Sequence, residues 1–143
     1  MKNQQATPLK QVLSIAAGLL AFAVIGSATA KELKVTLKGD QEVPAVTSAG
    51  TGTANITVND DGTVSGAVTT SGIVATKAHI HDAAAGANGP VILDLTKTGE
   101  TWTVPAGAKL TPEQLADYKA GKLYVNVHTA ANPKGDMRAQ LMP

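Results

Sequence analysis

The three histidines of this sequence are the residues whose type and spacing could do chemistry. His79 and His81 form a His-x-His pair in the segment 77–82, and His128 ends the segment 123–128. Residues two apart on a strand share one face and lie about 6.6 Å apart along it, so two imidazoles can reach one ion. Three neutral imidazoles that leave one coordination position of the ion open suit copper or zinc. The pattern therefore predicts a transition-metal site made of His79, His81 and His128.

The apolar residues around the histidines indicate which face of each strand they occupy. Ala78 and Ile80 alternate with the His-x-His pair, and three apolar residues alternate along the segment that ends at His128 (Leu123, Val125 and Val127). If these apolar positions face the core, all three histidines lie on the opposite face, with Tyr124 and Asn126 beside His128. We expect the three rings to converge if the two strands are neighbours in one sheet.

Other interpretations of these residues stay open. Histidines on a strand face are often polar surface groups, and they can also hydrogen-bond a nearby loop. Four acidic residues could supply a carboxylate to the histidines, although each could equally be a turn or surface residue (Glu42, Asp82, Asp94 and Asp136). The guanidinium of Arg138 could clamp a carboxylate such as Glu42 or Asp136. Met137 matches the core positions and is expected to pack there.

The first 30 residues differ from the rest of the chain. Lys2 and Lys10 are the only charged residues before position 31, the segment 12–25 is almost purely apolar, and residues 28–30 fit the small-x-small pattern that signal peptidase cleaves. Together these features predict a secretory signal peptide over residues 1–30. The apolar run is shorter than the stretch of about 20 residues that a membrane-spanning helix needs. We therefore expect a mature chain of residues 31–143, periplasmic or secreted, without a membrane span.

The charge balance and the lack of cysteine limit the kinds of molecule and metal site that this protein is expected to have as binding partners. Without Lys2 and Lys10, 10 basic residues stand against 11 acidic ones, a formal charge of −1. This near-neutral balance argues against nucleic acid or an anionic membrane surface as the partner. The sequence has no cysteine, so it can form neither a disulfide nor a thiolate metal site, and imidazole is the natural ligand. It also has no phosphate-binding glycine loop and no nucleophilic serine motif, which disfavours a hydrolase.

Alternation with a period of two runs through most of the mature chain. Apolar and polar residues alternate over 33–38, 51–58, 63–69, 91–96 and 123–128, which predicts strands with one face buried and the other wet or covered by a loop. The segment 59–62 predicts a hairpin turn. Residues 111–114 predict a helix start with a capping box, and Gly121 predicts its end. We expect an all-β fold, an antiparallel β-sandwich or a barrel-like Greek key, with one short helix.

Three separated motifs resemble the CHRD (chordin) domain family, in order, over nearly all of residues 33–141. The first is the segment 37–46 (LKGDQEVPAV) followed by Thr47 and Gly50. The second is the segment 78–81 (AHIH) followed by Gly86 and the segment 89–91 (GPV). The third is the segment 123–129 (LYVNVHT) with the later residues Asn132, Pro133, Gly135 and 138–141. The sequence departs from the family's pattern at positions 82–83, 134 and 139, which affects loop shape rather than fold.

The resemblance implies an extracytoplasmic β-rich domain, of the kind found in exported bacterial proteins and repeated in chordin. All three histidines fall on motif positions, which fits a metal site and a structural network alike. Chordin's binding of secreted growth factors does not transfer to a stand-alone domain, because fold does not carry function. The histidine strands are also similar, only locally, to the copper ligands of Cu/Zn superoxide dismutases. Because the chain has no further histidine, we do not expect a two-metal site.

Two functions of different classes follow. The first is an exported metal-binding module that holds copper or zinc through His79, His81 and His128, for buffering, delivery or protection against oxidants. The second is an extracytoplasmic protein-interaction module whose histidines are structural and bind no metal. A mononuclear copper enzyme is a third, less favoured interpretation, and we assign no enzymatic activity to the chain from its sequence.

Overall fold

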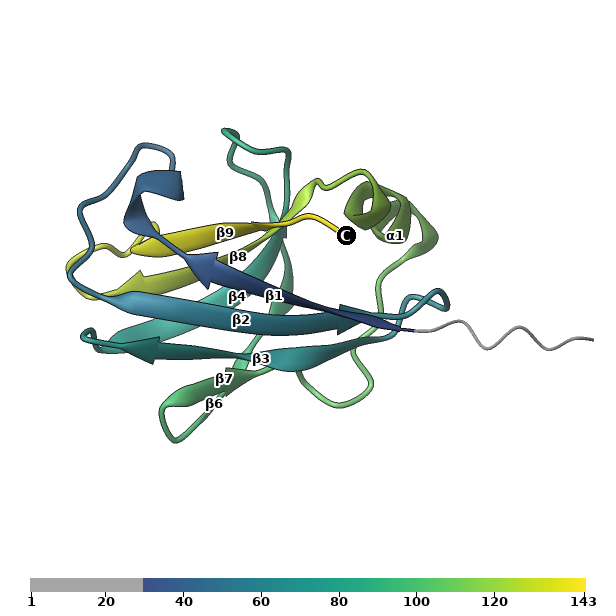
Figure 1. Ribbon diagram of the computed structural model, residues 1–143, viewed down its shortest axis with the longest axis horizontal. Coiled ribbons are helices and arrows are strands. Elements are labelled where there is room, and N and C mark those ends of the chain that lie inside the picture. The colour runs from purple at the N-terminus through teal and green to yellow at the C-terminus, as the bar shows by residue number, and fades with distance from the viewer. Residues whose placement is uncertain (1–29) are drawn as a thin grey trace, which may run out of the picture.

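The computed structural model describes residues 30–143, which form two antiparallel β-sheets packed face to face (Figure 1). The strands are β1 (Lys31–Leu37), β2 (Thr51–Val58), β3 (Val64–Ser71), β4 (Ala75–Asp82), β5 (Val91–Asp94), β6 (Thr96–Thr98), β7 (Thr101–Thr103), β8 (Leu123–Thr129) and β9 (Met137–Leu141). The first sheet has the order β1-β2-β3-β7-β6 and the second β5-β4-β8-β9. One isolated bridge joins the two sheets at an edge, where Lys38 and Arg138 exchange backbone hydrogen bonds of 3.0 Å. No barrel closes within residues 30–143, so the sandwich is the observed architecture. Apart from Ala30, the predicted signal peptide lies outside the described residues.

The core lies between the two sheets and is almost entirely aliphatic. Ala54 and Ile56 of β2 and Val125 and Val127 of β8 have no solvent exposure, or almost none, and alternate with polar residues as predicted. Met137 is also fully buried, which confirms its expected place in the core. Removal of these side chains from water is the main driving force that holds the two sheets together.

The predicted turn and helix are confirmed. In the turn between β2 and β3, Gly62 donates its N–H to the carbonyl of Asn59 and has a φ of +85°, a conformation that favours glycine. Helix α1 spans Pro112–Lys119 and begins with the capping box: Gln114 N–H donates to Thr111 Oγ1, and Thr111 N–H donates to Gln114 Oε1. Gly121, with a φ of +71°, follows the helix. No helix in residues 30–143 is long and apolar enough to cross a membrane.

The prediction of a single strand over 91–96 is wrong. β5 belongs to the second sheet and β6 to the first, and the chain crosses between the sheets at Leu95. Leu95 is buried and its N–H donates to the carbonyl of Ala78, whereas Val91 is 45% exposed. A register shift between Ile80 and His81 accompanies the pairing of β4 with β5. The pattern of alternation did not reveal that the chain changes sheets there.

The outward face of the second sheet is covered by loops. Every residue of β8 is buried, including those that point away from the core, such as Tyr124 and Asn126. The segment after β1, which includes the 3-10 helix η1 (Gly39–Gln41), and the segment 83–90 rise on the same side of the molecule (Figure 1). Asn88 joins them by donating to the carbonyl of Val43 at 2.8 Å. Polar side chains on this face therefore lie in a partly closed layer.

We expect Thr111→Ala to destabilise the protein by about 1 kcal/mol, because the substitution removes the side-chain oxygen that caps α1. Thr111→Ser keeps this oxygen and is the matched control. Urea unfolding followed by circular dichroism measures both variants. Equal midpoints for the Ala and Ser variants would show that the cap contributes nothing to stability.

Candidate metal centre

The three histidines converge on the outward face of the second sheet. His79 and His81 come from β4 and His128 from β8, and these strands are antiparallel neighbours. One ring nitrogen of each histidine can be chosen such that all three atoms lie within 4.8 Å of one another. The expectation that the two strands are neighbours in one sheet and that the rings converge is confirmed.

The core packing of β4 and β8 sets this arrangement. Ala78 and Ile80 are 1% exposed and Val127 is fully buried, so the histidines that alternate with them point away from the core. His81 and His128 are nevertheless 9% and 8% exposed, because loops cover them, and the side chain of His79 is 14% exposed. The cluster is thus largely shielded from water and opens to it at His79.

Two of the histidines are oriented by backbone carbonyls. His81 Nδ1 lies 3.0 Å from the carbonyl oxygen of Gly89, and His128 Nδ1 lies 3.0 Å from that of Pro133. A carbonyl oxygen only accepts hydrogen bonds, so each Nδ1 carries the proton of its neutral ring. The Nε2 atoms of His81 and His128 therefore carry lone pairs, which can accept a hydrogen bond or bind a metal ion.

His79 has partners at both ring nitrogens. Its Nδ1 lies 2.9 Å from His128 Nε2, and its Nε2 lies 3.3 Å from Asp94 Oδ1. Both facing atoms are acceptors, and a neutral imidazole has only one N–H, so neutral His79 can donate to only one of them at a time. A metal ion bound at Nδ1 would leave the proton on Nε2, where it donates to Asp94. All three rings would then use one nitrogen for the metal and the other for a hydrogen bond.

Burial lowers the pKa of each of the three histidines. The nearby Asp94 carboxylate opposes this effect on the pKa of His79, and the carbonyl contacts oppose it on the pKa values of His81 and His128. The cluster consequently favours neutral rings at neutral pH. Neutral imidazole is the form that binds metal ions.

An aromatic and cationic stack supports His81 from the side. The Tyr124 ring is stacked on His81, with centroids 4.7 Å apart and planes 8° apart, and Arg138 Cζ lies 3.5 Å from the Tyr124 centroid. Gly89 N–H donates to the hydroxyl of Tyr124 at 3.2 Å. The same two residues, Gly89 and Tyr124, therefore fix both the position and the tilt of the His81 ring.

Arg138 holds a loop. It donates to the carbonyls of Ala87 at 2.8 Å and Ala84 at 3.3 Å. The expectation that it clamps a carboxylate is corrected, because in the described residues it forms no ion pair within 4 Å. Arg138 is only 1% exposed, so its five N–H groups need acceptors inside the protein. The two carbonyls and the side-chain oxygens of Asn88 and Gln140 supply them.

Of the four acidic candidates, only Asp94 forms an ion-pair contact with a histidine in the described residues, and its side chain is 84% exposed. Asp136 accepts hydrogen bonds from Ser48, Thr129 and Asn132, which ties the segment 130–136 to the sheet. Sequence reasoning did not find the carbonyls of Gly89 and Pro133. The sequence signal for the first of these carbonyls is the glycine of the second motif, Gly89. The structure explains why a glycine stands there, because a Cβ at this position would overlap the carbonyl oxygen of Asp82.

Glu42 is a buried carboxyl next to the histidine cluster. It accepts a hydrogen bond from Asn126 Nδ2 and is 7% exposed. Burial raises the pKa of Glu42 from 4.5 to about 7, although the positive charge of Arg138 acts in the opposite direction. The folded protein therefore binds a proton at Glu42 more tightly than the unfolded chain does.

This pKa shift predicts how Glu42→Gln changes stability with pH. Between pH 4.5 and about 7 the unfolded chain ionises Glu42 before the folded protein does, so wild-type stability falls relative to the Gln variant as pH rises. The glutamine side chain keeps an acceptor for Asn126 without a buried charge. Above pH 7 we expect the variant to be more stable by about 1–2 kcal/mol. This value is smaller than the full pKa shift would give, because Glu42 is partly in contact with water, which screens its charge.

Thermal unfolding of both proteins at pH 5, 6, 7 and 8 measures this difference. The control is Glu32→Gln, an exposed residue of β1, which should give a small difference at every pH. A Glu42→Gln effect that stays constant from pH 5 to 8 would contradict the raised pKa.

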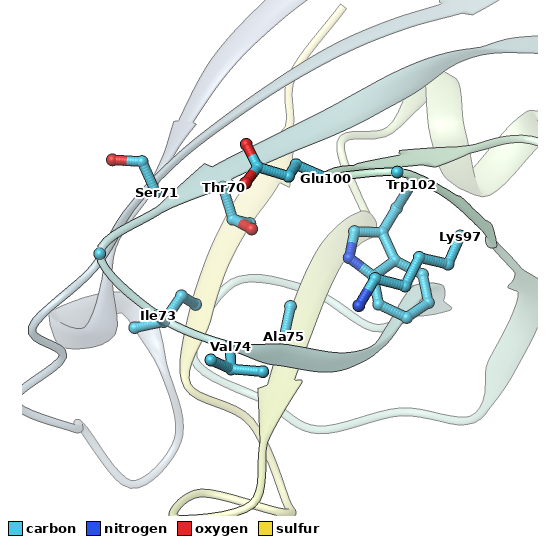
Figure 2. A pocket seen from close by; sticks show the side chains of 10 residues that line it. Thr70, Ser71, Ile73, Val74, Ala75, Lys97, Glu100 and Trp102 are labelled. Carbon is cyan, nitrogen blue, oxygen red and sulfur yellow. The ribbon is translucent and has the colours of Figure 1, made fainter.

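A separate cavity of about 300 Å³ lies where the β3–β4 turn approaches the β6–β7 hairpin. In Figure 2 the indole ring of Trp102 and the side chain of Lys97 form one side of it, and Ile73 and Val74 form the opposite side. The Lys97 ammonium lies 5.7 Å from the centroid of a Trp102 ring. None of the three histidines lines this cavity, so it is not part of the candidate metal centre.

The geometry defines a β-sandwich protein with a three-histidine cluster under its loops. The family model described as CHRD domain matches residues 33–141. The chain therefore belongs to the CHRD domain family, and the resemblance of the three motifs is confirmed. No curated protein and no solved structure matches the chain.

Proposed function

We propose that this CHRD domain protein binds one copper or zinc ion through His79, His81 and His128. The observation that carries the proposal is that the two nitrogens of each histidine ring can have different roles, one as a metal ligand and one in a contact with an oxygen atom. In each ring one nitrogen contacts a carbonyl or carboxylate oxygen (Nε2 of His79, Nδ1 of His81 and His128), which leaves the other nitrogen for the ion. One nitrogen of each ring lies within 4.8 Å of one nitrogen of the other two. Metal-binding histidines in proteins are held in this way by a second hydrogen bond.

The ligand set favours copper and zinc over other metals. Three neutral nitrogen ligands suit borderline ions, whereas magnesium and calcium require oxygen ligands. Among divalent ions of the first transition series, copper binds such ligands most tightly. Three protein ligands leave a coordination position open, as in zinc and copper sites that exchange a fourth ligand. Metal buffering, delivery or protection against oxidants are the roles that such a site supports.

The protein-interaction alternative rests on one observation of its own. The 2.9 Å distance between His79 Nδ1 and His128 Nε2 is that of a hydrogen bond, which would join β4 and β8 without any metal. On this interpretation the histidines are structural. It leaves the buried His81 Nε2 without a partner, whereas a metal ion would satisfy that atom. We therefore favour the metal-binding function.

We also propose that the protein is exported, with residues 1–30 as its signal peptide and the periplasm or the exterior as its destination. β1 begins at Lys31 and the family match begins at residue 33. Cleavage after Ala30 would therefore leave every strand of the sandwich intact. The lack of cysteine is compatible with an oxidising compartment, because no thiol is exposed to unwanted pairing.

Metal titration tests the proposed site. We expect the protein to bind one equivalent of Cu(II) or Zn(II) with micromolar or tighter affinity at pH 7.5, measured by calorimetry. His79→Ala and His128→Ala should each weaken binding at least tenfold, because they remove a ligand. Asp94→Asn should weaken it less than the alanine substitutions do, because it weakens only the contact of His79 Nε2 with an exposed carboxylate. Affinity should fall only below about pH 6.5, because burial lowers the pKa of each histidine.

Lys77→Gln is the matched control for these variants. Lys77 is exposed and pairs with His128 across the strands, so its substitution changes charge next to the site without removing a ligand. It should bind metal at least as tightly as the wild type. Equal and weak binding by the wild type, the two alanine variants and Lys77→Gln would support the interaction module instead.

Export is tested by intact-mass measurement of the protein recovered from an exporting bacterial cell. We expect the mass of residues 31–143, because residues 28–30 form the predicted cleavage site. An Ala28→Arg, Ala30→Arg double variant should accumulate at the mass of the full chain. A wild-type protein that keeps residues 1–30 outside the cytoplasm would contradict the assignment.

A further inference from the structure

Two buried side-chain polar atoms in residues 30–143 have no protein partner: His81 Nε2 and Asn126 Oδ1. The proposed metal ion accounts for the first. It does not by itself account for the second, although Asn126 is only 2% exposed. Buried acceptors in native proteins are almost always paired with protein or with ordered water. The oxygen of Asn126 therefore needs a donor that residues 30–143 do not supply.

Asn126 occupies the centre of the histidine face. It is directly opposite His79 in the pairing of β4 with β8, and it lies between Tyr124 and His128 along β8. Residues directly opposite on antiparallel strands have Cβ atoms about 4.5–5.5 Å apart. Asn126 is thus an immediate neighbour of two proposed metal ligands, one across the strands and one along the same face.

The orientation of the Asn126 amide is fixed by Glu42 and Gly135. Asn126 Nδ2 donates to Glu42 Oε1, so the amide oxygen is turned away from the carboxyl. A Cβ on Gly135 would lie 2.5 Å from Glu42 Oε2 and 2.6 Å from Asn126 Nδ2, which means that the backbone at Gly135 closes tightly over this pair. The amide cannot rotate without losing both its hydrogen bond and its packing.

We propose that Asn126 is a positioning residue of the metal centre, whose Oδ1 accepts a hydrogen bond from a water molecule in the coordination position that the histidines leave open. The inference rests on the proposed metal-binding function. Direct ligation by Oδ1 is less favoured, because amide oxygens are ligands of hard ions such as calcium and magnesium. A water molecule supplies both an oxygen for the metal and a donor for Asn126.

This role makes the open position selective. A small ligand that carries an O–H or N–H group can replace the water and still donate to Asn126. An anion without a donor, such as azide, would leave Oδ1 buried and unpaired, and unpaired buried groups weaken binding. The site should therefore favour protonated small ligands over anions that lack a donor.

Azide titration of the Cu(II)-loaded protein, followed by its charge-transfer absorption, tests the inference. We expect Asn126→Ala to bind azide about tenfold more tightly than the wild type, because the displaced water has lost its hydrogen bond. The control is Glu32→Gln, an exposed residue of β1 that takes no part in the histidine face and should leave azide affinity within twofold. Electron–nuclear double resonance in H₂O and D₂O should show that the exchangeable water protons near Cu(II) change in Asn126→Ala and not in the control.

Asn126→Ala leaves Glu42 without its donor and could fail to fold, so a second variant exchanges the pair. In Glu42→Gln/Asn126→Asp the amide and the carboxylate change places, which keeps the hydrogen bond and the side-chain volumes. The introduced aspartate is a stronger acceptor and carries a negative charge, so azide should bind more weakly than to the wild type. Unchanged azide affinity and proton couplings in this variant would overturn the role of Asn126.

The outcomes separate this inference from the proposed function. A wild-type protein that binds no Cu(II) overturns the metal centre and the role of Asn126 with it. A wild-type protein that binds Cu(II), but whose azide affinity is the same in Asn126→Ala and in the exchanged pair, retains its metal centre and loses only the positioning role.

Discussion

The pairing of β4 with β8 is the constraint on which the rest of the outward face depends. Their register places Ala78 opposite Val127 and Ile80 opposite Val125, and these residues are in the core. Because side chains alternate along a strand, a slip of one residue would bury the histidines and expose the valines. The free energy of burying aliphatic side chains therefore fixes which face the histidines occupy. Their arrangement is a consequence of core packing and needs no metal to form.

A polar layer above a sheet can be buried only if its groups find partners. Here the loops supply them: carbonyls of the segments 83–90 and 130–136 meet His81 and His128, and Arg138 holds the first of these loops in place. Tyr124 connects the two, because it contacts His81, Arg138 and the backbone of Gly89. Two buried atoms of this layer, His81 Nε2 and Asn126 Oδ1, have no partner among the described residues.

The sequence predicted what depends on alternation and missed what depends on loops. The apolar residues that alternate with His79, His81 and His128 correctly predicted the strand face on which the histidines lie. The capping box correctly predicted where α1 begins. The crossing at Leu95 could not be read from alternation, since 91–96 alternates on both sides of the change of sheet. Asp94 was one of four equal acidic candidates because only the pairing of β4 with β5 brings it opposite His79. The guanidinium of Arg138 donates to backbone carbonyls, although a carboxylate was expected. The positions of backbone carbonyls depend on loop conformation and cannot be deduced from a sequence.

The contact between His79 and His128 has a chemical consequence beyond structure. His128 Nε2 must accept, because its Nδ1 donates to Pro133, and His79 can satisfy either His128 or Asp94 with its single proton. The proposed metal ion would remove this conflict, since it would bind one lone pair of each ring and leave the other nitrogen's N–H with an acceptor. Burial lowers the pKa of each ring, so a second proton is a poor substitute for the ion at neutral pH. The same loops that exclude water from the cluster thus disfavour a second proton on its rings and keep them in the form that the proposed metal would bind.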